Sequence, residues 1–192
     1  MSTPVTEGTV RFHVPGVDKE CFTWYTVFGS LTEGTRRPLI GLHGGPGFAH
    51  DYLLPLRALA GAPYDVPVIL YDQIGGGRST RLPEKNGDVG FWTERLFVDE
   101  FDNLVRHLGV EGEYDVLGHS WGGMLAQMIA VRQPAGLKKL VLTNSLADMG
   151  LWIASAKKLL MQLPKETQVG ALGQDRVAVV DERCLPGYHR EA

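Results

Sequence analysis

The sequence predicts an α/β fold, in which helices flank both faces of a mostly parallel sheet. Short apolar segments such as residues 66–71 alternate along the chain with amphipathic segments such as residues 93–108. Strands that are apolar throughout are typical of parallel sheets buried between helices. With 192 residues, of which 44% are hydrophobic, the chain is long enough to form one sizeable core.

The predicted elements follow in chain order. Residues 9–14 and 23–28 alternate in polarity and carry β-branched and aromatic side chains, which predicts two antiparallel strands joined through residues 15–18. Further strands are expected at 39–42, 66–71, 114–117 and 139–143, and helices at 51–60, 93–108, 122–132 and 148–163. The helix at 93–108 is amphipathic, because seven of its residues follow helical spacing: Leu96, Phe97, Glu100, Phe101, Leu104, Val105 and Leu108.

Composition excludes several classes of function. A net charge of −3 without a basic stripe argues against nucleic acid as a partner. No apolar run approaches the roughly 20 residues that span a bilayer, and residues 1–8 lack the regions of a signal peptide, so we expect a cytoplasmic protein. Cys21 and Cys184 lie in no redox or metal-ligand spacing, and the histidines form no paired metal motif. We therefore expect two free thiols, no metal and no other cofactor.

The most informative motif is Gly118-His119-Ser120-Trp121-Gly122. An expected strand ends here and an apolar helix follows, and a serine in Gly-x-Ser-x-Gly at such a turn is a typical nucleophile of acyl transfer. Glycine neighbours let the strand and the helix approach closely, and the free N–H groups of the helix start face the serine, where negative charge would develop. A chance match in a chain with 24 glycines is the alternative, which the strand and helix context disfavours.

A second glycine loop, His43-Gly44-Gly45-Pro46-Gly47, follows the third expected strand. Acyl transfer needs two N–H donors aimed at the oxyanion, one from the residue after the nucleophile, here Trp121, and one from the loop after the third strand. Gly44 and Gly45 are the candidates for the second donor, and Gly44 is preferred. We expect His43 to orient this loop rather than to act as a base. A tight turn that needs glycine for its dihedral angles is the alternative.

A third glycine loop spans residues 72–79 and begins Asp72-Gln73. Three successive glycines suggest a phosphate cradle, but neither Gly-Lys-Ser/Thr nor Gly-x-Gly-x-x-Gly is present, which argues against a nucleotide site. We expect a structural role, in which Asp72 and Arg78 pair across the loop and brace the site from behind.

Together the three motifs resemble the proline iminopeptidase (prolyl aminopeptidase) family of α/β-hydrolases, over roughly residues 9–163. The resemblance implies an α/β-hydrolase core with the first six strands over residues 1–147, the start of a helical lid over 148–168, and a divergent, irregular tail over 169–192. It also implies a serine hydrolase that cleaves a peptide or amide bond after a small N-terminal residue, typically proline, through an acyl-enzyme. The substrate is then a small peptide or an amino-acid amide, since relatives with these motifs also act as amidases or esterases. Epoxide and haloalkane hydrolysis need a carboxylate where this chain has Ser120, so these two reactions are set aside.

The remaining catalytic groups are not identified by the sequence. A serine nucleophile is usually followed in the chain by an acid and then by a histidine. After Ser120 the only histidine is His189. Between them the candidate acids are Asp148, Asp175, Asp181 and Glu182.

Two interpretations of His189 stay open. In one, Asp181 and His189 form a compressed acid–base pair. In the other, which is favoured, His189 is a solvated residue of the tail. The family places its acid and histidine after a seventh and an eighth strand, so the favoured interpretation makes the fold incomplete in its C-terminal half. The chain is then a truncated hydrolase, and the alternative function is a non-catalytic remnant that lacks the acid and the histidine.

Overall fold

The computed structural model describes residues 3–32, 34–165 and 167, which fall into two compact units. The first, here called the sheet unit, comprises Met1–Asn86 and Glu94–Ser145. The second, the helix unit, comprises Gly87–Thr93 and the described residues from Leu146 onward. All three glycine motifs lie in the sheet unit.

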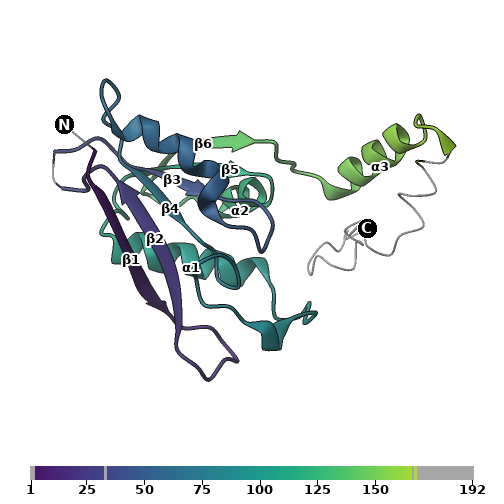
Figure 1. The fold of residues 1–192 in the computed structure, drawn as a ribbon, viewed down its shortest axis with the longest axis horizontal. Helices are drawn as coiled ribbons and strands as arrows, with labels where there is room; N and C mark the ends of the chain where they lie inside the picture. Colours follow the sequence, from purple (N-terminus) through teal and green to yellow (C-terminus); the bar gives the residue numbers. More distant parts are fainter. Residues whose placement is uncertain (1–2, 33, 166, 168–192) are drawn as a thin grey trace. The chain divides into compact units, whose positions relative to one another are not determined.

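The sheet unit contains one sheet of six strands in the order β1-β2-β4-β3-β5-β6 (Figure 1). The strands are β1 (Val5–Phe12), β2 (Cys21–Phe28), β3 (Leu39–Leu42), β4 (Val68–Tyr71), β5 (Tyr114–His119) and β6 (Leu137–Thr143). The predicted fold class is confirmed, because helices flank this mixed sheet and the number of strands is the expected one. The first strand begins four residues before its predicted start at residue 9.

Pairing of the strands brings the glycine loops together. β1 and β2 form the predicted antiparallel pair, and β2 also runs antiparallel to β4. β3 pairs in parallel with β4 and with β5, and β5 pairs in parallel with β6. The carboxyl ends of β3, β4 and β5 therefore meet at one edge of the sheet, where ligands bind in open α/β sheets.

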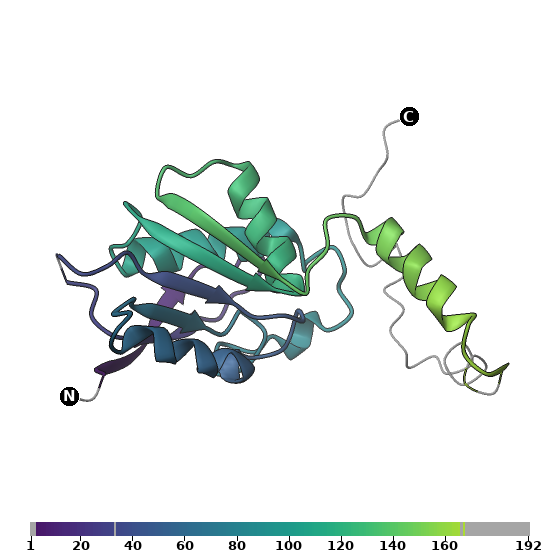
Figure 2. The same ribbon diagram turned by 90° about the horizontal axis from the view of Figure 1, so that it is seen from above.

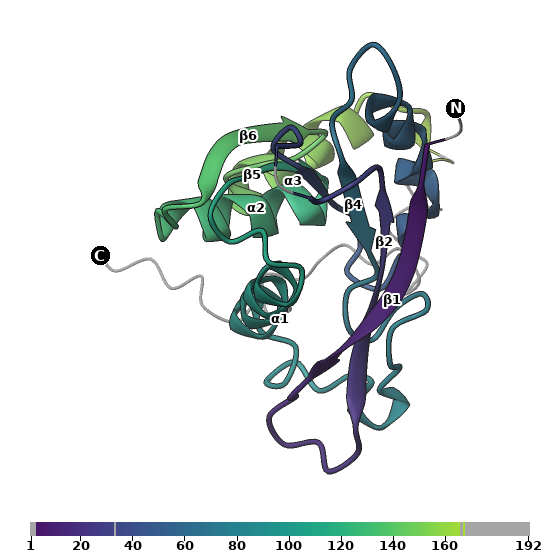
Figure 3. The same cartoon turned by 90° about the vertical axis from the view of Figure 1, so that its left-hand side faces the viewer.

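Helical segments cover both faces of the sheet. The segment η1 (His50–Ala60) lies on one face, whereas α1 (Glu94–His107) and α2 (Trp121–Val131) lie on the other (Figures 2 and 3). η1 packs a cluster of apolar side chains against the sheet: Phe28, Leu53, Ala60, Val68 and Leu70. A short 3₁₀ turn, η2 (Pro83–Lys85), precedes the segment that leads to α1.

The segment expected as a helix at 51–60 is a 3₁₀-helix with Pro55 inside it. Proline carries no N–H to donate, and its ring conflicts with regular α-helical geometry. The segment therefore forms a 3₁₀-helix, which is tighter than an α-helix and has less favourable hydrogen-bond geometry. The helix predicted at 93–108 is confirmed as α1, with Phe97, Phe101 and Leu104 almost fully buried.

The edge of the sheet formed by β6 carries exposed apolar side chains. β6 pairs with β5 on one side only, at the end of the strand order. Val141 and Leu142 on this strand are 44% and 45% exposed. An exposed edge strand with apolar side chains is a ready template for pairing with another strand.

The helix unit contains α3 (Met149–Leu160), whose start is capped by Asp148. The Asp148 carboxylate accepts a hydrogen bond from the N–H of Leu151 at 2.8 Å, which satisfies one free donor of the first turn. The expected tail over 169–192 lies outside the described residues. Within the described part of the chain, no helix is long and apolar enough to cross a membrane.

Candidate active site

Ser120 sits at a sharp turn between β5 and α2. Its backbone has φ 54° and ψ −121°, a conformation that side-chain-bearing residues adopt only when the surrounding structure imposes it. The Ser120 N–H donates to the carbonyl of Thr143 on β6 at 3.1 Å. The hydroxyl of Ser145 donates to the Ser120 carbonyl at 3.0 Å. These bonds from β6 and the segment after it help hold the strained turn.

The three glycines around Ser120 lie where a side chain would collide with backbone or with a neighbouring side chain. A Cβ on Gly118 would lie 2.6 Å from Cα of Gly123, and a Cβ on Gly122 would lie 2.6 Å from the His43 carbonyl oxygen. A Cβ on Gly123 would overlap the side chain of Ser145. The glycines therefore permit the close approach of β5, α2 and the loop after β3 that the turn requires.

Gly44 lies directly beside the candidate nucleophile. A Cβ on Gly44 would be 3.2 Å from Cβ of Ser120. The Gly44 N–H donates to the hydroxyl of Tyr52 at 2.6 Å. That hydroxyl also lies 3.0 Å from Nδ1 of His119. The structure thus brings together Ser120 and the predicted glycine loop, and adds Tyr52 from η1.

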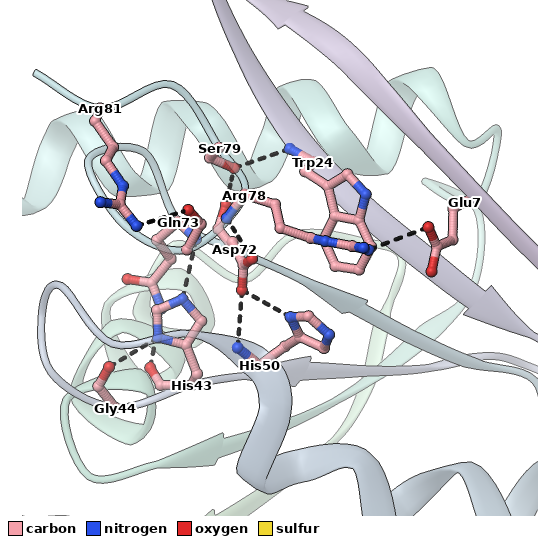
Figure 4. A network of polar contacts seen from close by, with 11 residues as sticks. Glu7, Trp24, His43, Gly44, His50, Asp72, Gln73, Arg78, Ser79 and Arg81 are labelled. Carbon is pink, nitrogen blue, oxygen red and sulfur yellow. Dashed lines mark hydrogen bonds and ion pairs between the residues drawn. The ribbon is translucent and has the colours of Figure 1, made fainter.

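His43 is fully buried and both of its ring nitrogens are used within the loops. Nε2 accepts a hydrogen bond from the Gln73 N–H at 3.0 Å, so the neutral ring carries its proton on Nδ1, which donates to the Gly44 carbonyl at 2.8 Å (Figure 4). Burial lowers the pKa of His43, which keeps the ring neutral. Because no ring nitrogen is left over, this geometry suits an orienting residue and not a general base.

Gln73 connects the two loops that flank Ser120. Its Nε2 donates to the His43 carbonyl at 2.9 Å, and its Oε1 accepts from the indole N–H of Trp121 at 2.8 Å. The side chain is 1% exposed. A single buried amide therefore ties the loop after β3 to the residue that follows the nucleophile.

Asp72 and Arg78 pair across the loop as expected, but through the Arg78 backbone and not through its guanidinium. The buried Asp72 carboxylate accepts from the Arg78 backbone N–H at 2.8 Å and from the N–H and Nδ1 of His50 at 2.8 and 2.9 Å (Figure 4). The Arg78 guanidinium lies 4.5 Å over the ring of Trp24 and pairs with Glu7 at 3.1 Å. The tight glycine turn presents its backbone to the carboxylate, while the long side chain extends to the outer strands. Asp72 still braces the loop, through backbone donors.

Glu100 joins α1 to the same loop. Its carboxylate accepts from the Ile74 N–H at 2.9 and 3.0 Å and from the Thr23 hydroxyl. Burial is the largest influence on this group and raises the pKa of Glu100 to about 8. The loop after β4 is therefore anchored at Asp72, Gln73 and Ile74 by three different parts of the sheet unit.

Sequence reasoning missed the roles of Tyr52, Gln73 and Glu100. For Glu100 a signal was present, because an acid stands within the otherwise apolar stripe of α1. Gln73 is the second residue after Tyr71, the last residue of β4, and site residues gather at the carboxyl ends of such strands. Tyr52 carried no signal, because its place beside Gly44 arises only when η1 folds back over the sheet.

The other predicted residues fall in different places. Asp148 caps α3. Asp175, Asp181, Glu182 and His189 lie outside the described residues, as does Cys184. The hydroxyl of Ser120 has no hydrogen-bond partner within residues 3–32, 34–165 and 167.

Comparisons with known proteins agree with this fold. A sequence profile described as the alpha/beta hydrolase fold matches residues 37–176. The chain is 37% identical over 147 residues to a proline iminopeptidase of Lactobacillus delbrueckii subsp. lactis, which covers 76% of this chain and 48% of that protein. A proline iminopeptidase of Clostridioides difficile is 34% identical over 169 residues, covering 88% of this chain and 53% of that protein. The chain spans about half the length of these curated relatives.

Solved structures give the same result. The crystal structure of VinJ superposes with a TM-score of 0.78 at 46% identity, covering 88% of this chain and 53% of that chain. A proline iminopeptidase of Mycobacterium smegmatis superposes with a TM-score of 0.70 at 44% identity, covering 86% of this chain and 53% of that chain. The predicted resemblance to the proline iminopeptidases is confirmed, and the profile match over most of the chain shows that it belongs to the α/β hydrolase fold family.

Proposed function

We propose that this chain carries the nucleophilic half of a serine hydrolase of the proline iminopeptidase type. Its reaction is cleavage of a peptide or amide bond after a small N-terminal residue, typically proline, in a small peptide or an amino-acid amide. The observation that carries the proposal is the strained backbone of Ser120 at the strand-to-helix turn, with φ 54°. Strain of this kind persists where a serine hydroxyl must project at the end of a sheet.

In the proposed mechanism, Oγ of Ser120 attacks the substrate carbonyl carbon and transfers its proton to a base. The carbonyl oxygen becomes an oxyanion, which accepts hydrogen bonds from the backbone N–H of Trp121 and from that of Gly44 or Gly45. The base then gives this proton to the leaving nitrogen, and collapse of the intermediate expels the amine and leaves an ester on Ser120. Water, activated by the same base, then hydrolyses the ester and restores the serine.

The base is the part of this mechanism that the described residues do not supply. Both nitrogens of His43 are engaged with loop backbone, which argues against its use. His189 with Asp181 is one source. The C-terminal half that the relatives have and this chain does not match is the other, and we favour it. In well-studied enzymes that have lost a member of the triad, the oxyanion donors and substrate binding alone still accelerate the reaction about 10³–10⁴-fold over the rate in water.

A complementation assay tests this proposal. The purified chain is given a proline anilide, alone and after co-expression with the C-terminal half of a proline iminopeptidase relative. We expect chromophore release to be slow for the chain alone and to rise by several orders of magnitude with the second half. Release must disappear in the Ser120→Ala variant of this chain. No Ser120-dependent release in either sample would contradict the proposed function.

A non-catalytic hydrolase remnant is the second candidate. It is favoured by the exposed apolar side chains of Val141 and Leu142 on the edge strand β6. This candidate predicts strong binding of a hydrophobic dye, low solubility and no change in any assay on Ser120→Ala. A monomeric chain with turnover that depends on Ser120 would exclude it.

A further inference from the structure

We propose that Tyr52 is a positioning residue. By holding the Gly44 N–H it fixes the His43–Gly44 peptide, and together with the His43 ring, which holds the Gly44 carbonyl, it sets the direction of the Gly44–Gly45 peptide beside Ser120. This inference rests on the proposed function. It also decides between the two candidate donors in the loop, since it assigns Gly45 as the second oxyanion donor. Tyr52 lies in η1, outside all three glycine motifs.

The first line of evidence is the hydrogen bond between the Gly44 N–H and the Tyr52 hydroxyl. At 2.6 Å from nitrogen to oxygen it is a short bond. A donor that is already used in this way is not free to bind a substrate oxygen. The N–H of Gly45, in contrast, has no hydrogen-bond partner within the described part of the chain.

The second line of evidence is the direction of the peptide plane. The Gly44 carbonyl accepts from Nδ1 of the buried His43 ring at 2.8 Å, so this carbonyl points toward His43. In a trans peptide the N–H of the next residue points the opposite way, and the Gly44–Gly45 bond is not among the cis peptide bonds of the described residues. The Gly45 N–H therefore points away from His43. Both ends of Gly44 are thus fixed, its N–H by Tyr52 and its carbonyl by His43.

The third observation is the contact between Tyr52 and the strand-to-helix turn His119–Ser120–Trp121, here called the elbow. The Tyr52 hydroxyl lies 3.0 Å from Nδ1 of His119, the residue before Ser120, and the two rings meet edge to face with centroids 5.1 Å apart. Burial raises the pKa of Tyr52, so the hydroxyl stays protonated at neutral pH. It can accept from Gly44 and still take part in a bond with His119. One side chain therefore joins the glycine loop to the elbow.

The competing interpretation is that the Tyr52 hydroxyl occupies the oxyanion position and blocks it. In that case Gly44 is the second donor and substrate must displace Tyr52. The two interpretations predict opposite effects of Tyr52→Phe on the reactivity of Ser120, which makes them separable by experiment. Tyr64→Phe is the matched control, because Tyr64 is 55% exposed and lies beyond the end of η1.

The first measurement is the amide resonance of Gly44. His43–Gly44 is the only His-Gly pair in the sequence, so protein labelled with carbonyl-¹³C histidine and ¹⁵N glycine gives a single peak in an HNCO spectrum. We expect Tyr52→Phe to move this amide proton upfield and to speed its exchange with solvent, while Tyr64→Phe leaves both unchanged. A Gly44 resonance that is the same in the wild type and Tyr52→Phe would overturn the inference.

The second measurement is the rate at which a fluorophosphonate probe labels Ser120. We expect Tyr52→Phe to lower this rate about tenfold or more, because a misdirected donor loses its hydrogen bond to the developing charge. Tyr64→Phe should label at the wild-type rate. Faster labelling of Tyr52→Phe would overturn the inference in favour of a blocking hydroxyl. If the wild type is not labelled at all, the proposed function fails, and the Gly44 resonance alone decides whether Tyr52 positions the loop.

Discussion

At the scale of single residues, the site depends on close backbone contacts that only small or precisely placed residues allow. Gly122 packs against the carbonyl of His43, and Gln73 bonds to that same carbonyl. Ser120, two residues before Gly122, is held with φ 54°. The geometry of Ser120 is therefore set by its neighbours, and changes in those neighbours should be costly even though none of them reacts.

Gly122→Ala tests the backbone contact. The new methyl group would be pressed against the carbonyl oxygens of Leu42 and His43, and backbone cannot rotate away as a side chain can. We expect a loss of about 1–3 kcal/mol or more in the free energy of unfolding, measured by urea denaturation. Gly112→Ala is the matched control, since a Cβ there meets nothing within 4 Å. Equal stability of the two variants would show that the elbow is not tightly packed.

Gln73→Leu tests the amide link. Leucine leaves the indole N–H of Trp121 and the carbonyl of His43 without their side-chain partner in a buried site. Each unsatisfied buried polar group costs about 1–3 kcal/mol, so both the stability and the rate of Ser120 labelling should fall. Gln162→Leu in the helix unit, an exposed position, serves as the control. Unchanged labelling of Gln73→Leu would mean that the link does not position Trp121.

At the scale of elements, most of the sheet and its helices could be predicted because their signals are local. Period-two alternation identified β1 and β2, apolar runs identified β3 and β4, and helical spacing identified α1. The form of η1 was missed because Pro55 acts on backbone geometry without disturbing the apolar pattern. Partners across elements were also missed. The Arg78 side chain reaches Glu7, 71 residues away in sequence, and no local pattern contains that contact.

The packing of α1 against the loop after β4 makes a prediction about pH. The pKa of Glu100 rises to about 8 in the fold through burial, from an ordinary value near 4.3 in the unfolded chain. Between these values the unfolded state binds fewer protons than the folded state, so stability falls as pH rises and then levels off above about 8. Urea midpoints measured from pH 5 to pH 9 should show this fall.

Glu100→Gln should flatten this pH dependence, because the amide does not titrate. Asp99→Asn on the same helix is the control, since Asp99 is partly exposed and pairs with Arg95 across one helical turn. The control should keep the wild-type slope. A Glu100→Gln variant with an unchanged slope would show that another group controls stability in this range.

At the scale of the whole molecule, the candidate site exists because strand order brings three loops to one edge of the sheet. The sequence motifs predicted these loops and their order, since each motif follows an apolar strand. They did not predict that Tyr52 would join them, because that contact depends on how η1 folds over the sheet. They favoured Gly44 over Gly45 as the second donor, whereas the inference drawn from the structure assigns Gly45, because the choice depends on the direction of a single peptide plane. The sequence pattern thus predicts which residues lie together, and the packing of the folded chain determines the role of each residue.

The most direct test of Ser120 as the nucleophile is labelling of the purified chain with a fluorophosphonate probe, with the modified peptide identified by mass spectrometry. We expect one adduct, on Ser120, that is absent in Ser120→Ala while the other serines stay unlabelled in both proteins. The fold of Ser120→Ala should be retained, as checked by circular dichroism. A folded wild-type chain that forms no adduct at Ser120, or a Ser120→Ala variant labelled as fast as the wild type, would contradict the assignment of Ser120 as the nucleophile.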